Sequence, residues 1–410
     1  MSTLSRVLVF LACCLMVQPA GANDARILAF ETLAFDAVPS RGQPSAVERF
    51  AFSAFGQAFE LELTSNARLL DALDATVRAS AIGTDNLFLH GAIVGNEGSW
   101  ARLSRIDGRW TGGFHDGREL YLMDAAEKVA TLLPRHANPG STVLYRMSDL
   151  VMPRFHGGIV SVSDAYKPTA RGADYARFVD HLQASVGLAG TATRELGITV
   201  VTDTEYSAVH GGDANAVTAS QINMVDGIYS AQLGIRITAT HVSNLRENGP
   251  LAVGNDPVQV LQAFQAFMFD GAGSAIPKGG LNQLFTGRVF DFGVLGIAVW
   301  NPGVGVLCDP ERGYAASSVV VANNISVIVI AHEIGHNFAA PHDGEGGSAC
   351  AAQAGSWLMS PNAPLGTTTF SPCSLAQIAA PIQAATCITP TAEIIFRDAF
   401  ESPMGAADSL

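Results

Sequence analysis

Residues 332–343 contain three histidines and a glutamate at spacings that suit metal-assisted hydrolysis. His332 and His336 are four residues apart, so on a helix they lie on one face and can reach the same ion. His342 supplies a third imidazole just beyond them. Three protein ligands leave the fourth position of a tetrahedral zinc ion open for water, as in catalytic zinc sites. The spacing therefore predicts a catalytic zinc site.

Glu333 directly follows the first of these histidines and projects to a neighbouring position around the same helix. From there its carboxylate can hold a metal-bound water, whose pKa zinc lowers to about 7. We expect Glu333 to be the general base that takes the proton of this water and later passes it to a leaving amine. The predicted activity is that of a zinc endopeptidase, a hydrolase of internal peptide bonds.

The element that must position these side chains is a helix. An apolar run, Val319–Ala331, leads into the histidines, and no proline occurs in it or after it before Pro341. Its many β-branched residues would also suit a strand, so the helix prediction depends partly on the ligand geometry.

Six further segments match one known family. They are Asn337-Phe338, Asp343, Leu358-Met359-Ser360-Pro361, Phe370-Ser371-Pro372-Cys373-Ser374, Gly287-Arg288-Val289-Phe290-Asp291 and Gly296-Ile297-Ala298. Together with the histidine motif they resemble the metzincin metallopeptidases, in the adamalysin or reprolysin branch that includes the ADAM proteases and snake-venom metalloproteinases. The resemblance covers about residues 195 to 388.

The resemblance implies an α/β metzincin-type catalytic domain, with a mixed sheet and an active-site helix. It implies one catalytic Zn²⁺ held by His332, His336 and His342. Met359 would belong to a methionine turn and form an apolar floor beneath the zinc without ligating it, although a buried methionine is commonly a packing residue. Calcium is possible, and no residue pattern of the chain specifies it.

The chain departs from the family at Ala339, where a glycine is usual. That glycine lets the chain leave the helix and turn toward the third ligand, often with φ above zero. Alanine in a left-handed conformation costs on the order of 1 kcal/mol, which a metal site contributing about 10 kcal/mol or more could offset. We therefore expect an active site with local strain at Ala339.

Composition and charge exclude several classes of protein. About half of the 410 residues are hydrophobic and 15% are charged, so the chain can bury a large core and form two or three domains. The net charge is −13, and no basic tract occurs. Binding to nucleic acid or to an anionic membrane surface is therefore disfavoured.

Residues 1–22 have the pattern of a signal peptide. An apolar core, Val7–Val17, precedes the small-residue cleavage site Ala20-Gly21-Ala22. This core is too short to span a bilayer, and a lipoprotein anchor at Cys13 or Cys14 is the weaker alternative. No other segment is long and apolar enough for a membrane span. We therefore expect a secreted protein, extracellular or else periplasmic.

The cysteines outside the signal peptide all lie in the last quarter of the chain. An even number in an exported protein suggests two disulfides, and three pairings of Cys308, Cys350, Cys373 and Cys387 are open. Similarity to the adamalysins implies the pairs Cys308 with Cys387 and Cys350 with Cys373. These bonds would brace the segment that carries the third histidine and the methionine turn.

The sequence divides into four expected parts. They are a signal peptide (1–22), a β-rich propeptide domain with a linker (23–190), the zinc metallopeptidase catalytic domain (191–390) and a flexible C-terminal tail (391–410). Alternating segments such as Phe59–Leu63 predict strands in the second part. The segment Phe59–Leu70 resembles the propeptide of ADAM-type enzymes, and an unrelated β-rich accessory domain is the alternative.

A zymogen of this kind would need an unusual form of latency. The chain has no cysteine between Cys14 and Cys308, so a propeptide could not block the zinc with a thiolate. Latency would have to be steric or use another ligand. The Gly- and Ala-rich stretch around Ser161 to Thr193 is the expected linker and activation site.

Hydrophobic patterns also predict the elements of the catalytic half. The expected strands are 197–201 and 235–239, and the expected helices are 219–233 and 256–269. Gly296–Val299 is the candidate cleft-edge strand, which would pair with an extended substrate backbone. Its ordinary alternative is a buried strand of the sheet.

Protein or peptide substrates are therefore the expected partners, with the chain's own propeptide as inhibitor. The leading hypothesis is endoproteolysis of extracellular or host proteins. The alternative is a zinc-containing binding module without turnover, which an intact Glu333 argues against. A zinc exopeptidase is a third hypothesis, which internal cleavage products would exclude.

Overall fold

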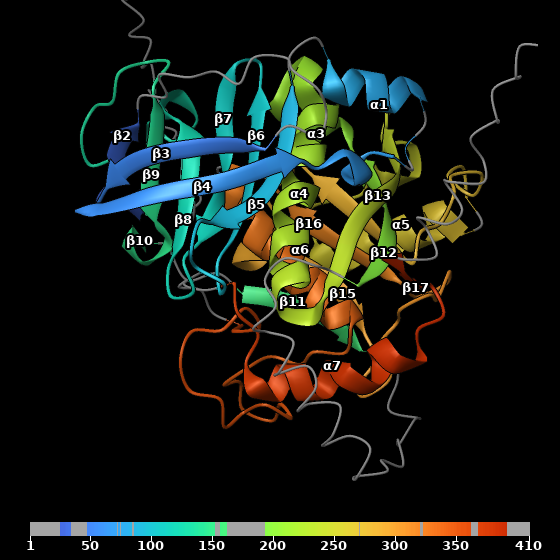
Figure 1. Cartoon of the computed structure of the whole chain (residues 1–410). Helices are drawn as coiled ribbons and strands as arrows, with labels where there is room; N and C mark the ends of the chain where they lie inside the picture. Colours follow the sequence, from blue (N-terminus) through green and yellow to red (C-terminus); the bar gives the residue numbers. More distant parts are fainter. Residues whose placement is uncertain are drawn as a thin grey trace, which may run out of the picture.

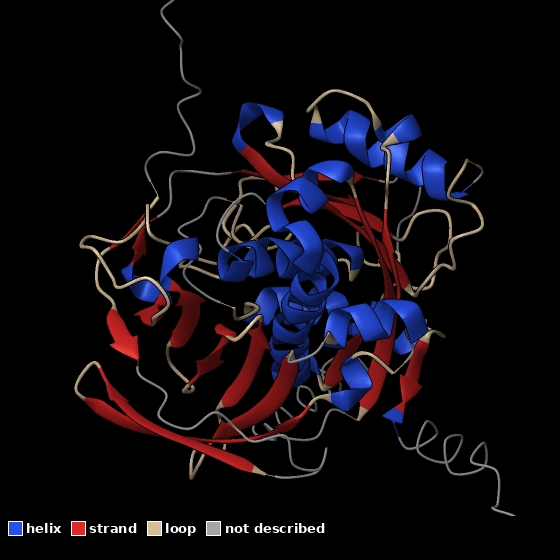
Figure 2. Cartoon of the chain, turned by 90° about the horizontal axis from the view of Figure 1, so that it is seen from above, coloured by secondary structure: helices blue, strands red, loops and turns tan. Residues whose placement is uncertain are grey.

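The computed structural model describes residues 25–33, 47–71, 73, 75–83, 86–151, 156–161, 193–269, 271–319, 323–361 and 368–391. The expected signal peptide, activation linker and tail lie outside these residues, apart from the end residues of the linker and tail. The described residues form two large β-sheets with helices between them (Figures 1 and 2). The fold is therefore layered as sheet, helices and sheet.

The N-terminal sheet is an antiparallel meander of eight strands among the described residues, in the order β2-β9-β8-β7-β6-β5-β4-β3. Its strands are β2 (Glu31–Leu33), β3 (Glu48–Ala54), β4 (Gln57–Ser65), β5 (Leu87–Ile93), β6 (Trp100–Ile106), β7 (Arg109–His115), β8 (Leu120–Ala125) and β9 (Thr142–Arg146). Two of its hairpins turn at Phe55-Gly56 and Asp107-Gly108, all with positive φ, as two-residue hairpin turns require. The predicted β-rich N-terminal region is confirmed.

The catalytic half is built on a mixed sheet. Its main path runs β11-β15-β16-β14-β12-β13, and β17 pairs with β12. The strands are β11 (His156–Ser161), β12 (Arg194–Thr202), β13 (Ile235–Asn244), β14 (Leu281–Thr286), β15 (Val294–Trp300), β16 (Tyr314–Ser318) and β17 (Ile388–Pro390). A separate pair joins β1 (Arg26–Ile27) to β10 (Leu150–Val151). The strands predicted from the patterns at 197–201 and 235–239 are confirmed.

The candidate cleft-edge strand is part of β15. It is antiparallel to β16 on one side and parallel to β11 on the other. Among the described strands it therefore lies inside the sheet, as the ordinary alternative predicts. The strand that covers it belongs to the expected propeptide region.

Six α-helices are present in the described residues. They are α1 (Ala75–Ile82), α3 (Thr204–His210), α4 (Ala214–Leu233), α5 (Pro257–Phe269), α6 (Asn323–Asn337) and α7 (Pro372–Ala384). The helices predicted at 219–233 and 256–269 correspond to α4 and α5. Of all these helices, α4 and α6 contact both large sheets, and Figure 1 shows them at the centre of the molecule.

The β-branched run before the histidines forms α6 because both sides of this helix are covered. One side packs on β15 and β16, and the other meets α4, β7 and β8. Every described side chain from Asn324 to Asn337 is buried. A helix enclosed in this way is apolar all round and shows little periodicity in its sequence. The predicted helix is confirmed, with its start at Asn323.

Helix α4 joins the two halves of the chain. Sixteen of its twenty residues are buried. Its Asp226 carboxylate accepts hydrogen bonds from the Arg102 guanidinium of β6 at 2.8 Å, and both side chains are buried. Asn223 donates to the carbonyls of Leu89 and Leu103 at 3.2 Å. The N-terminal sheet and the catalytic half thus share one core, with satisfied polar contacts inside it.

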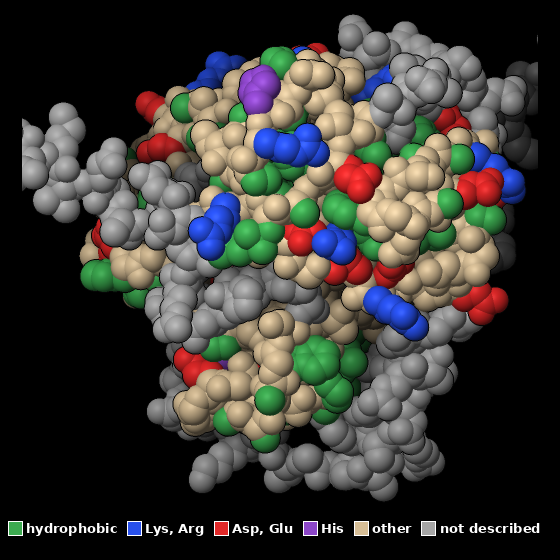
Figure 3. All heavy atoms as spheres, turned by 90° about the vertical axis from the view of Figure 1, so that its left-hand side faces the viewer, with side chains coloured by type: hydrophobic (Ala, Val, Ile, Leu, Met, Phe, Trp, Pro, Cys, Tyr) green, Lys and Arg blue, Asp and Glu red, His purple; other side chains and the backbone are tan. Residues whose placement is uncertain are grey.

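No described helix is long and apolar enough to cross a membrane. On the face drawn in Figure 3, acidic and basic side chains are interspersed with hydrophobic and neutral ones. That face therefore offers no large area of a single charge.

One buried carboxyl group in the N-terminal sheet gives a pH-dependent stability. Asp124 lies on β8 and accepts a hydrogen bond from the Tyr145 hydroxyl at 2.8 Å. Burial raises the pKa of Asp124 from 3.8 to about 7. The folded protein therefore keeps a proton that the unfolded chain loses above pH 4. The stabilisation is complete below about pH 4 and is lost as the pH rises through about 7.

We expect Asp124→Asn to remove this pH dependence. The difference of about 3 pKa units corresponds to at most about 4 kcal/mol, which the wild type loses between pH 4 and 8 and the variant keeps. Urea unfolding of both proteins between pH 5 and 8 measures the gap, which should grow in favour of asparagine as the pH rises. A gap that does not change with pH would contradict the assignment.

Candidate metal centre

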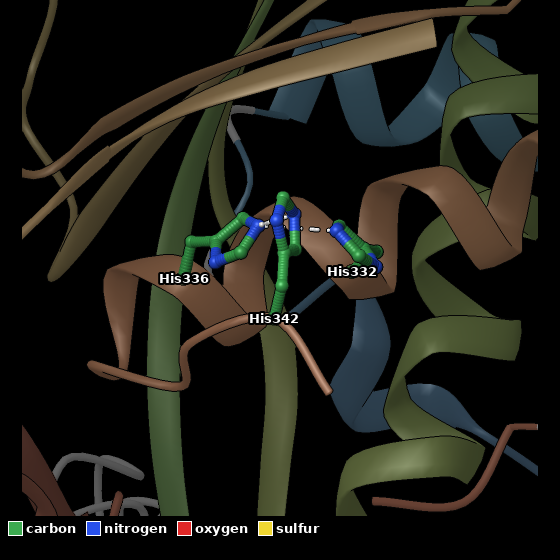
Figure 4. Close-up of side chains that lie close together, drawn as sticks. All are labelled: His332, His336 and His342. Atoms are coloured by element: carbon green, nitrogen blue, oxygen red, sulfur yellow. Dashed lines mark hydrogen bonds between the residues drawn. The ribbon is translucent and has the colours of Figure 1, made fainter. Parts of the chain in front are cut away.

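The three predicted histidines converge on one point. His332 and His336 project from α6, and His342 lies on the loop that follows it (Figure 4). The Nε2 atom of His336 is 3.0 Å from that of His332 and 3.1 Å from that of His342. All three side chains are buried, and they form the one cluster of potential metal ligands among the described residues.

Each imidazole is oriented by a partner on its outer nitrogen. His332 Nδ1 donates to the Leu358 carbonyl at 2.6 Å, and His336 Nδ1 donates to the Ala340 carbonyl at 2.8 Å. His342 Nδ1 donates to the Glu345 carboxylate at 2.7 Å. Carbonyls and carboxylates accept hydrogen bonds, so the proton of each neutral ring is on Nδ1. All three Nε2 lone pairs therefore point inward.

The Nε2 atom of His336 is about 3 Å from each of the other two, and none of the three carries a proton that could form a hydrogen bond between the rings. Three lone pairs that face one another in this way fit a bound cation. Burial lowers the pKa of His332 to about 3, with the neighbouring His342 adding to the shift. Burial likewise lowers the pKa of His336 and His342. Neutral imidazoles with a fixed Nδ1 proton are the form in which histidine binds zinc. The residues present thus fit the metal that the spacing predicts.

Helix α6 ends as the strain argument predicts. Ala339 has φ of +82°, in the left-handed region. Its N–H donates to the His336 carbonyl at 2.9 Å, and the Ala340 N–H donates to the Gly335 carbonyl at 3.0 Å. The Trp300 indole holds the Ala339 carbonyl at 3.0 Å. The left-handed turn redirects the chain so that His342 can reach the other two histidines.

We expect Ala339→Gly to stabilise the protein by up to about 1 kcal/mol, since glycine removes the left-handed strain but adds freedom to the unfolded chain. Ala340→Gly is the matched control. Ala340 has no positive φ, so glycine there should destabilise by about 0.5–1 kcal/mol. Denaturant unfolding with saturating zinc tests both variants. Equal effects at the two positions would show that Ala339 stores no strain.

Met359 lies against the helix at the level of the histidines. A Cβ added at Gly335 would lie 2.5 Å from the Met359 sulfur, so only glycine allows this close approach. The methionine is fully buried, and its carbonyl accepts the Asp343 N–H at 2.9 Å. The turn therefore supports both α6 and the chain beside His342.

Glu333 is buried directly behind β15. It is 1% exposed, and its Oε2 atom has no hydrogen-bond partner among the described residues. Burial raises the pKa of Glu333 well above its usual value. A Cβ added at Gly296 of β15 would come within 2.6 Å of the Glu333 Cγ atom. Gly296 thus lets the strand pass this close to the carboxylate.

Side chains outside the histidine cluster also support the site. Asp343 accepts from the hydroxyls of Ser371 at 2.6 Å and Ser374 at 3.1 Å, which ties the loop after His342 to α7. Glu345, which orients His342, has only its acidic character as a signal. Gly296 does have a sequence signal, because a glycine inside a strand marks the close approach of another group.

Both disulfides have the pairing that the resemblance implies. Cys308 is bonded to Cys387, and Cys350 is bonded to Cys373. The first joins the loop before β16 to the segment before β17. The second joins α7 to the loop after His342. The bonds therefore hold the segment that carries the third histidine and Met359 against the rest of the fold.

Comparison with known proteins gives the same assignment. A family model described as metallo-peptidase family M12, of the reprolysin type, matches residues 192–371. Disintegrin and metalloproteinase domain-containing protein 10 of Rattus norvegicus is 24% identical over 387 residues, covering 80% of this chain and 50% of that protein. The Homo sapiens protein is 23% identical, covering 80% and 51%. The chain spans about half the length of these relatives.

Disintegrin and metalloproteinase domain-containing protein 11 of Mus musculus is 25% identical over 293 residues, covering 67% of this chain and 36% of that protein. The matched region of the family model contains all three histidines, Glu333 and Met359. The geometry of the histidines and these matches agree: residues 192–371 form a metallopeptidase domain of family M12, of the reprolysin type.

Proposed function

We propose that the chain is an exported zinc endopeptidase, which hydrolyses peptide bonds of extracellular or host proteins with Glu333 as general base. The observation that carries this proposal is the convergence of three neutral Nε2 atoms, two of them from a helix that also carries the buried Glu333 carboxylate with one unpartnered oxygen. A purely structural zinc site would close its fourth position with another protein ligand. None is present among the described residues around these histidines.

Each residue has a distinct role in the proposed reaction. His332, His336 and His342 would hold one zinc ion, which when bound supplies Lewis-acid chemistry and lowers the pKa of a water molecule to about 7. Glu333 would accept the proton of the attacking water and deliver it to the leaving nitrogen. A cation at the histidines favours the ionised form of a carboxyl group nearby, which offsets the effect of burial on Glu333.

Substrate backbone would be positioned by β15. An extended peptide can add to an exposed sheet edge through main-chain hydrogen bonds, which bind many sequences alike. Because Gly296 brings β15 into contact with Glu333, a peptide bound on this edge would lie beside the proposed base. This arrangement favours cleavage within a chain over removal of terminal residues.

The N-terminal region, residues 23–190, is proposed to be a propeptide with its linker. It would follow a signal peptide (1–22) and precede the catalytic domain (191–390) and the C-terminal tail (391–410). Residues 192–410 make up about half the chain, so a match over 80% of it must include part of the N-terminal sheet. This supports a propeptide related to the N-terminal region of those relatives over an unrelated accessory domain. Removal of residues 1–22 would precede its action.

The proposal is tested with the exported protein after processing. Casein and an internally quenched peptide should be cut at internal bonds, as mass spectrometry of the products shows. A chelator should stop the reaction, and zinc should restore it. One mole of zinc per mole of protein without turnover of a broad peptide library would instead identify a binding module.

A further inference from the structure

We infer that β11 (His156–Ser161) is an autoinhibitory strand, which keeps the enzyme latent by occupying the edge of β15 that a substrate backbone needs. This inference rests on the proposed function and adds the means of its regulation. It also answers how a propeptide without cysteine could block the site.

The first step is the extent of the pairing. From Gly157 to Ser161, β11 pairs in parallel with β15, residue by residue, from Gly296 to Trp300. At its start, His156 pairs with Val294 across a register shift. A strand has two hydrogen-bonding edges, and the other edge of β15 is used by β16. While β11 is in place, both edges of β15 are therefore occupied from Gly296 to Ala298.

The second step is the place of this contact relative to the proposed base. Gly157 pairs with Gly296, the residue at which an added Cβ would come within 2.6 Å of Glu333. The covered stretch, Val294–Trp300, therefore includes the residue that lies against Glu333. Gly157 and Gly158, which pair with Gly296 and Ile297, have no side chains with which to fill a specificity pocket. They occupy the edge through backbone alone.

The third step is how β11 is held. It follows β10 of the N-terminal region after four residues and leads into the expected activation linker around Ser161 to Thr193. The N-terminal region is fixed to the catalytic half by the buried pair of Arg102 and Asp226 and by Asn223. A single cut in the linker would leave β11 joined to this anchored region. Activation therefore requires release of β11 from β15 in addition to that cut.

The test replaces two adjacent residues of β11 in the full-length protein. Gly158→Pro with Ile159→Pro removes a ladder N–H whichever of the two residues faces β15. Ile159→Val is the conservative control. Gly172→Pro with Ala173→Pro places the same two prolines in the linker. If β11 is paired in 90–99% of molecules, its release should raise casein hydrolysis about 10- to 100-fold, and neither control should do so.

Amide hydrogen exchange at Val294–Trp300 is measured on the same samples. In the wild type these amides should be protected, and in the β11 double-proline variant those that face β11 should exchange faster. Rapid exchange in the wild type would overturn the inference without reference to any variant. Zinc content, expected at one mole per mole, confirms that the variant retains its metal centre.

The two proposals fail in different ways. If the double-proline variant exposes β15 but hydrolyses casein at the same measurable rate as the wild type, β11 is not inhibitory and the protease assignment stands. If β15 is exposed, zinc is bound and neither protein hydrolyses casein even after linker cleavage, the protease assignment itself is wrong.

Discussion

Replacing Glu333 with alanine should lower kcat/KM for peptide hydrolysis by about 10²–10⁴-fold, the range that a general acid–base group contributes. The physical reason is that Glu333 is the buried carboxylate next to His332 on α6, and its Oε2 atom has no hydrogen-bond partner among the described residues. Zinc should remain bound, because Glu333 is not one of the converging ligands. The measurement is steady-state hydrolysis of a quenched peptide by the processed protein, with metal analysis of the same sample.

Glu333→Gln separates proton transfer from space filling. Glutamine has nearly the volume of glutamate and cannot serve as a base near neutral pH. It should therefore be as inactive as alanine while preserving the packing against Gly296. Wild-type turnover in the glutamine variant would remove Glu333 from the mechanism and leave the metal centre unaffected.

Replacing His336 with alanine should abolish both zinc binding and activity. His336 is the central member of the cluster, within 3.1 Å of both other Nε2 atoms. Removing the hydrogen-bond acceptor that orients a metal-binding histidine lowers metal affinity about 10- to 100-fold. Removing the histidine itself should lower the affinity further. After dialysis the variant should contain little zinc and show no measurable hydrolysis.

Thermal unfolding provides a readout for His336 that is independent of activity. Zinc at about 1,000 times its Kd stabilises the folded state by about 4 kcal/mol, so a chelator should lower the Tm of the wild type. The Tm of His336→Ala should not respond to the chelator. His115→Ala is the control, because His115 lies on β7 of the N-terminal sheet. That variant should keep its zinc and its chelator response, and a loss of both would show that the assay reports general unfolding.

The catalytic centre could be predicted from sequence because its chemistry is local. His332, Glu333 and His336 lie on one helical turn, so their spacing fixes their mutual positions without knowledge of the fold. Ala339 was predictable for a similar reason, since a chain that must turn sharply after a helix needs a left-handed residue. Its φ of +82° confirms that expectation.

The layers around the centre could not be predicted in this way. The apolar residues of α4 recur at helical spacing, which predicts the helix. That spacing does not show that Asn223 and Asp226 are buried against another sheet. Their partners, such as Leu89 and Arg102, are more than 100 residues away in sequence. The pairing of β11 with β15 is equally non-local, because main-chain hydrogen bonds leave no signature in residue types.

The burial of α4 between two sheets has a consequence for producing this enzyme. Expression of residues 193–391 alone would leave Asp226 without its counter-ion and would expose an apolar helix face to water, conditions that favour aggregation. Recombinant work should therefore start from the whole polypeptide, in an oxidising host compartment where both cystines can form, and introduce any cleavage only after purification.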